Sequence, residues 1–267
     1  MSEEKVNLSR SQPGEEGYVP PAAAVPLPSQ GKVYPAGSPL AGVQLVEVKA
    51  MTAKEEDILT SQGLLRQGKA LDVLLKSCMV DKRIDVDQML AGDRNAALIA
   101  IRITGYGQAY KVKVECPQCG QKCDHEFDLA KLPVKPLGAD PVQPNTNQFS
   151  FRLPILQKDV IFRLMTGADE RELSTIFDRQ RKMGGMIDSL ITTRLHHQVV
   201  SVGGETDRAK LMRLIQSMPA RDSRELRAHI ERVTSGVDMK QEFECSQCGA
   251  VEEVDVPLGT EFFWPQA

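Results

Sequence analysis

Six cysteines are the residues of this 267-residue sequence best suited to chemistry, and four of them form two CxxCG segments far apart in the chain. Zinc prefers four tetrahedral thiolate or imidazole ligands, and a CxxC turn supplies two sulfurs along one edge of that tetrahedron. Because a closed four-sulfur site keeps no open coordination position, its role would be structural rather than catalytic. The spacing therefore predicts a structural zinc site whose ligands are Cys116, Cys119, Cys245 and Cys248.

The residue after each cysteine pair is glycine, Gly120 or Gly249. Glycine tolerates positive φ, which suits a tight turn whose backbone N–H groups point at the thiolates. Two alternatives remain open at this point. An iron–sulfur cluster is not excluded by sequence spacing alone. The other alternative is a local metal site, formed only by residues close together in the sequence: Cys116, Cys119, Cys123 and His125. Such a site would leave the second cysteine pair without a metal.

Strand-like alternation of apolar and charged residues flanks both cysteine pairs. A period of two is typical of strands with one buried face, so we expect two similar hairpins, each with its CxxCG segment at the turn. They cover residues 108–130 and 238–261. If the sulfurs of both hairpins bind one ion, the chain leaves the metal site after the first hairpin and returns to it at the second. Metal binding is then coupled to folding. The intervening residues 131–237 are then an insertion in a split zinc ribbon.

Helical periodicity precedes the first hairpin, over residues 44–107. Thr52 and Glu55 form a capping box that opens a helix. Another helix begins near Asp93, and its run from Ala96 to Ile101 is apolar on nearly every side, so it should be the most buried helix of this lobe. The insertion has the pattern of one more hairpin followed by helices. The predicted fold class is α+β: a zinc ribbon with a helical N-terminal lobe and a hairpin-plus-helices insertion.

The first 43 residues hold 7 of the 16 prolines and 5 of the 20 glycines, without apolar periodicity. Such a composition buries too little surface to offset the ordering entropy, so residues 1–43 are predicted to form an extended arm. Two roles are open for it. It is either a passive tail or an arm that wraps a neighbouring subunit and becomes ordered on assembly.

Two surfaces are candidates for partner binding. The aromatic residues of the tail 262–267, Phe262, Phe263 and Trp264, either cover the ribbon core or anchor in a neighbour's pocket. Arg221 and Arg224 belong to a basic helix face, which is either solvated and salt-bridged or a docking surface.

Composition excludes several classes of protein. With 41% hydrophobic and 26% charged residues, the chain can bury a core, which excludes disorder throughout. A net charge of -3 argues against a general grip on nucleic acid, and residues 241–267 contain six acidic side chains and no basic one. No apolar run approaches the roughly 20 residues that cross a bilayer, and the N-terminus lacks a signal-peptide pattern. We therefore expect a cytoplasmic protein with no membrane contact.

No catalytic constellation is recognisable, because HExxH, GxSxG, a P-loop and a GxGxxG after a strand are all missing from the sequence. The sequence therefore predicts that the chain is not an enzyme.

Three stretches occur in the order MTAKEEDILTSQGLLRQGKALDVLLKSC, GDRNAALIAIRITGYG and MPARDSRELRAHI, followed by GVDM, the second cysteine pair and FFW. In these the sequence resembles the baseplate hub subunit family of T-even-like contractile-tailed phages and related prophages, over roughly residues 44–264. The resemblance implies a non-catalytic component of the tail baseplate or of its assembly, bound to other tail proteins in a hetero-oligomer. It would be found in the virion tail, or in the host cytoplasm during assembly. The alternative, a zinc-ribbon regulator that binds nucleic acid, would need a basic stripe.

Overall fold

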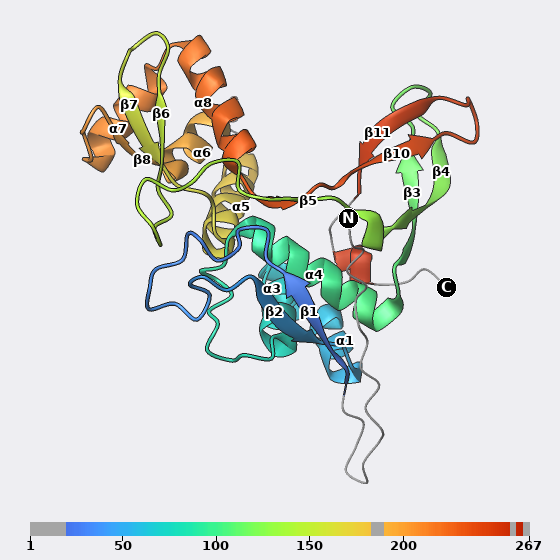
Figure 1. Cartoon of the computed structure of the whole chain (residues 1–267). Helices are drawn as coiled ribbons and strands as arrows, with labels where there is room; N and C mark the ends of the chain where they lie inside the picture. Colours follow the sequence, from blue (N-terminus) through green and yellow to red (C-terminus); the bar gives the residue numbers. More distant parts are fainter. Residues whose placement is uncertain (1–19, 183–189, 257–259, 264–267) are drawn as a thin grey trace, which may run out of the picture.

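A long helix, α4 (Ala91–Tyr106), lies at the centre of the protein, and three groups of elements surround it (Figure 1). The computed structural model describes residues 20–182, 190–256 and 260–263. Ala97 and Ile101 on α4 are fully buried, and Leu98 and Ile99 are nearly so. The prediction that this helix is deeply buried is confirmed.

The N-terminal group packs against α4 and consists of a two-stranded sheet and three shorter helices. Alternate residues of both strands face the core, among them Val25 and Val48, so this sheet is apolar on the side toward α4. The strands pair antiparallel, with Ala24 opposite Glu47. The elements are β1 (Ala22–Pro26), β2 (Leu45–Lys49), α1 (Ala53–Thr60), α2 (Gln62–Arg66) and α3 (Ala70–Cys78).

The prediction of an extended arm is wrong for residues 20–43, because they form β1 and a packed loop. The Asp93 carboxylate at the start of α4 is fully buried and anchors this loop. It accepts hydrogen bonds from the Ser29 backbone N–H at 2.9 Å, the Ser29 hydroxyl at 2.5 Å and the Tyr34 hydroxyl at 2.6 Å. The expected boundary at residue 43 therefore falls inside one unit, and residues 1–19 lie outside the described residues.

Both expected cysteine hairpins are present, and each forms its own two-stranded antiparallel sheet. They lie beside each other at one end of the molecule (Figure 1). Their inner faces carry buried residues such as Tyr110, Phe127 and Phe243. The strands are β3 (Ala109–Glu115) and β4 (Lys122–Asp128), then β10 (Lys240–Glu244) and β11 (Val251–Asp255).

The insertion forms a separate lobe on the other side of α4 (Figure 1). The predicted hairpin is present, but it gains a third strand that helical periodicity did not indicate. Asp222 on the last helix accepts hydrogen bonds from the backbone N–H groups of Ile155 and Leu156, which joins the hairpin turn to that helix. The elements are β6 (Phe149–Arg152), β7 (Asp159–Phe162), α5 (Gly167–Lys182), α6 (Leu190–Gln198), β8 (Val199–Val202), α7 (Arg208–Gln216) and α8 (Ala220–Val233).

The chain enters and leaves the insertion at one place, where β5 (Val134–Lys135) pairs antiparallel with β9 (Gly236–Val237). The returning strand crosses α4 at Gly92. A Cβ on Gly92 would lie 2.0 Å from the Ser235 carbonyl oxygen, so only glycine permits this approach.

We expect Gly92→Ala to lower the free energy of unfolding by about 2 kcal/mol or more, because β9 must move away from α4. Gly63→Ala is the matched control, since its Cβ would meet nothing closer than the Ser61 hydroxyl at 4.0 Å. Alanine there should be neutral or stabilising by up to about 1 kcal/mol. Urea unfolding of both variants checks this, and equal effects would contradict the close approach.

The predicted capping box at Thr52 and Glu55 is also confirmed. Glu55 is fully buried and accepts hydrogen bonds from the Ser77 hydroxyl at 2.6 Å and the Lys49 ammonium at 3.0 Å. Burial alone would raise the pKa of Glu55, but hydrogen bonds from Ser77, Thr52 and Lys49 outweigh it and lower the pKa to about 2.

Because the pKa of folded Glu55 lies below its ordinary value of 4.5, the ionised carboxylate stabilises the fold above that pH. This contribution is lost as the pH falls from 4.5 toward about 2. Glu55→Gln should lower the free energy of unfolding by about 1–3 kcal/mol at neutral pH, and the deficit should shrink in acid. Urea titrations across this range measure it, with the exposed Glu47→Gln as the control that should show no such trend.

Candidate metal centre

Four cysteine sulfurs from the two hairpins meet in one cluster, in which all Sγ atoms lie within 4.8 Å of one another. Two of the contacts cross between the hairpins. Cys116 Sγ lies 3.8 Å from Cys248 Sγ, and Cys119 Sγ lies 3.8 Å from Cys245 Sγ. The structure thus brings together the four predicted ligands.

These separations fit a metal better than a disulfide. A disulfide needs sulfurs about 2.05 Å apart, and all four cysteines are free. In a tetrahedron with metal–sulfur bonds of about 2.3 Å, neighbouring sulfurs are about 3.8 Å apart. The observed contacts match that edge, so the donor set fits one tetrahedral ion.

The two CxxCG turns have the same backbone arrangement. In the first, the Gly120 N–H donates to the Cys116 carbonyl at 2.8 Å, and in the second the Gly249 N–H donates to the Cys245 carbonyl at 2.9 Å. Gly120 and Gly249 both have a φ of 69°, the left-handed region that favours glycine. The role predicted for both glycines is confirmed.

Electrostatics at the cluster also favour a cation. The backbone N–H groups of Cys248 and Gln247 donate to the Cys245 sulfur and lower its pKa to about 6. For Cys119, the Gln121 N–H lowers the pKa, but burial and the neighbouring thiols outweigh it and raise the pKa to about 12. Without a positive charge, the crowded sulfurs oppose joint ionisation, whereas a metal ion would stabilise all four thiolates.

The local-site alternative does not match this arrangement. Cys123 is buried and its Sγ lies 3.6 Å from Cys245 Sγ, but it is not one of the four clustered ligands. The His125 ring instead packs edge-on against Phe127 and Phe243, with ring centroids 4.5 and 5.2 Å away.

A family described as T4 bacteriophage base plate protein matches residues 24–264. The chain belongs to this family. The match begins within β1, so it includes most of the packed loop that composition had assigned to an arm. Comparison with curated proteins finds no match, and comparison with solved structures finds none either.

Membership supports a structural role in a phage baseplate, in contact with other tail proteins and located in the virion tail. In the part of the chain that the structure describes, no helix combines the length and apolar character needed to span a membrane.

The aromatic C-terminal segment of this baseplate-family chain covers its own core. Phe262 and Phe263 are fully buried, and the Phe262 ring lies 5.0 Å from that of Tyr110. The buried Arg102 guanidinium donates from Nε to the Phe262 carbonyl at 2.9 Å. Of the two roles left open, burial favours core covering for both phenylalanines, so the expectation that they bind a partner is wrong for Phe262 and Phe263. Trp264 lies outside the described residues.

Arg221 and Arg224 are exposed on α8, where a partner can reach them. Arg224 forms an ion pair at 3.0 Å with its neighbour Glu225. Exposed ion pairs of this kind contribute little to the stability of the fold. A role for Arg221 and Arg224 in docking a partner stays a prediction.

An ionic cluster that sequence analysis missed joins α3, α4 and α5. The nearly buried Asp72 accepts from Arg94 Nη2 at 2.5 Å and also from Arg171, and Arg171 donates to Asp87 at 2.6 Å. In the sequence these residues resemble ordinary charges on solvated helix faces. Their burial depends on how three helices pack, which no local pattern indicates.

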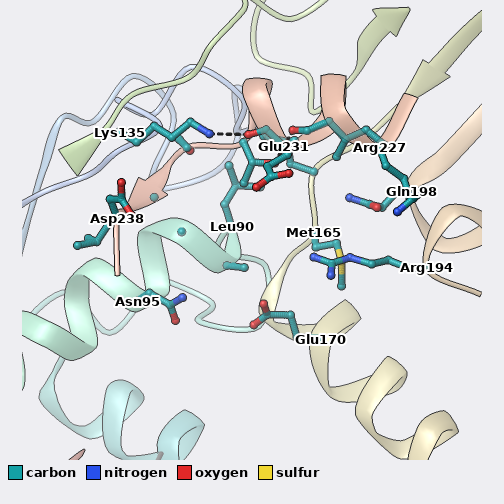
Figure 2. A pocket seen from close by; sticks show the side chains of 18 of the residues that line it. Leu90, Asn95, Lys135, Met165, Glu170, Arg194, Gln198, Arg227, Glu231 and Asp238 are labelled. Carbon is teal, nitrogen blue, oxygen red and sulfur yellow. Dashed lines mark hydrogen bonds between the residues drawn. The ribbon is translucent and has the colours of Figure 1, made fainter. Parts of the chain in front are cut away.

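A cleft of about 750 Å³ lies where α4, the insertion helices and β9 meet (Figure 2). Figure 2 shows Glu170 and Arg194 on the α5–α6 side and Arg227 and Glu231 on α8. Its walls mix charged and apolar residues, and no histidine or cysteine lines it.

The four-ligand assignment predicts one zinc ion per chain when the protein is purified with its native metal. Cys119→Ser and Cys248→Ser should each reduce bound zinc at least tenfold under mild chelation, because three thiolates hold zinc much less tightly than four. Cys123→Ser is the matched control and should keep the full equivalent. Elemental analysis measures this. Loss of zinc in Cys123→Ser but not in Cys248→Ser would instead support the local site.

Proposed function

We propose that this chain is a structural or assembly protein of the baseplate hub, in which a zinc-stapled scaffold presents fixed surfaces to other tail proteins. The observation that carries the proposal is a closed four-thiol centre in a chain of the baseplate family. The chain would act by geometry, without catalysing a reaction.

Zinc is the metal we assign to the four thiols. Tetrahedral thiolate sets select zinc or iron, and zinc is the redox-silent one of the two. Bound by all four cysteines, it would keep no position for a substrate. The chain's own residues supply the rest of the site, since backbone N–H groups in and beside the two CxxCG turns donate to the sulfurs of Cys119, Cys245 and Cys248.

In this proposal the two hairpins and their metal form a split zinc ribbon, with the insertion lobe emerging from its base. The scaffold is held at more than one place. Zinc would fix the hairpins to each other, while the buried Asp72–Arg94 pair and its neighbour Arg171 fix α5 to the N-terminal group. Removing the metal should therefore loosen the hairpins more than the contact between α5 and α3.

Partners would be proteins of the tail, reached through exposed surfaces such as the α8 face with Arg221 and Arg224. The nucleic-acid alternative is not favoured, because Glu242 and Glu253 face outward on the second hairpin and would repel phosphate. That the chain is neither an enzyme nor a nucleic-acid binder is part of this proposal.

The test is complementation of a phage or prophage that lacks this gene, with tails counted by electron microscopy and proteins identified by mass spectrometry. The wild-type chain and Cys123→Ser should restore contractile tails and co-purify with baseplate proteins. Cys119→Ser/Cys248→Ser should lower tail yield at least tenfold, because the scaffold loses its metal. Normal tails without the gene would contradict the proposal. The protein content of purified virions tells a retained subunit from an assembly factor.

A further inference from the structure

The second cysteine hairpin presents an outer face with a net negative charge, on which four exposed carboxylates outnumber one lysine, Lys240, opposite Asp255. Glu242 and Glu253 are exposed and directly opposite each other across β10 and β11. Glu244 and Asp255 are exposed on the same face, and no ion pair involves any of these four among the described residues. Like charges directly opposite each other destabilise a strand pair, so this face carries an unfavourable interaction that folding does not require.

The first hairpin is an internal control, because it has the same turn and the same pairing. On its outer face three of the four directly opposed pairs join opposite charges: Lys111 with Glu126, Lys113 with Asp124, and Glu115 with Lys122. Lys111 Nζ lies 3.8 Å from a Glu126 carboxylate oxygen. The first hairpin balances most of its outer charges, whereas the second opposes Glu242 to Glu253 and keeps a net negative face, so the acidic face is not a requirement of the fold.

A complementary surface exists on α8 of the same chain. Its outward side carries three exposed arginines, of which Arg224 is paired with Glu225. The other two, Arg221 and Arg232, form no ion pair with a carboxylate of the described residues. We call these three residues the α8 arginine face. Arginine forms charge-assisted hydrogen bonds with carboxylates and is enriched at protein interfaces.

The two faces belong to different lobes, and Figure 1 shows α8 and the β10–β11 hairpin on opposite sides of the molecule. They therefore cannot neutralise each other within one chain. We propose that the acidic face of one copy, formed by Glu242, Glu244, Glu253 and Asp255, docks on the α8 arginine face of a second copy. The contact joins two different surfaces, which makes it heterologous. This inference does not depend on the baseplate role.

Sedimentation of the full-length, metal-loaded chain tests the proposal. At about 0.01 M salt the average mass should rise with protein concentration to at least about twice the monomer mass, and at about 1 M salt it should return to the monomer, because salt screens exposed charges. Two variants should each abolish the association at low salt. They are the acid-neutral chain, Glu242→Gln/Glu244→Gln/Glu253→Gln, and the arginine-neutral chain, Arg221→Gln/Arg224→Gln/Arg232→Gln.

Mixing provides the decisive measurement. The acid-neutral chain keeps its arginine face and the arginine-neutral chain keeps its acidic face, so an equimolar mixture should associate although each variant alone does not. Lys111→Gln/Glu126→Gln is the matched control, since it removes a charge pair from the first hairpin without changing net charge, and it should associate like wild type. Circular dichroism and zinc content establish that each variant is folded.

Several outcomes would overturn the proposal. Wild-type protein that stays monomeric at low salt has no such contact, and association that survives both variants uses other surfaces. A mixture that stays monomeric would show that the two faces do not bind each other. If the wild type is monomeric but tail particles capture it through Glu242 and Glu253, the acidic face binds a basic partner instead of a second copy.

Discussion

The structure depends on the meeting of four thiols that are far apart in the chain. Cys119 and Cys245 are 126 positions apart, and Cys116 and Cys248 are 132 apart. Because both ends of the intervening segment must reach the same cluster, the insertion is a closed loop and its strands β5 and β9 must run side by side. The entropy cost of closing a loop grows only logarithmically with its length, so a whole lobe can be accommodated between the two hairpins. The contact that closes the loop is therefore the one that brings the two cysteine hairpins together.

Helix α4 organises the other attachments through three charged residues that it buries. Asp93 receives the N-terminal loop through Ser29 and Tyr34. Arg94 binds Asp72 on α3, and Arg102 holds the Phe262 carbonyl at the C-terminal segment. A buried charge is costly unless it is paired and hydrogen-bonded, so each of these residues favours one specific partner over alternative packings. The helix therefore combines an apolar core with directional contacts to separate parts of the chain.

Much of the metal centre could be predicted from the sequence, because its signals are local. The CxxCG spacing, the positive φ of Gly120 and Gly249, and the alternation along the hairpin strands all depend on a few neighbouring residues. The capping box at Thr52 and the buried run of α4 are local for the same reason. Periodicity and turn chemistry were sufficient for these elements.

The errors arose where distant residues decide the structure. Residues 20–43 lack periodicity, yet a buried carboxylate on α4 and strand pairing with β2 hold them in place. Phe262 is buried because Arg102 and Tyr110 lie where residues 260–263 pack against α4. The cluster around Asp72 combines charges from three helices. Composition describes the average cost of ordering a segment, but it does not identify a partner elsewhere in the chain that offsets the cost.

The two cysteine hairpins separate what the fold requires from what it leaves free. Both must supply two thiols, a glycine after them and an apolar inner face, since the cluster and the core fix these positions. Neither requirement extends to the outer faces, and there the hairpins differ, with three oppositely charged pairs on one and only one, Lys240 with Asp255, beside the like-charged Glu242 and Glu253 on the other. Selection for the metal centre alone gives no reason for Glu242 to face Glu253. Under the proposed docking contact, the difference reflects a constraint from outside the monomer, and the charges that select a partner lie on a surface that the repeated backbone presents but does not determine.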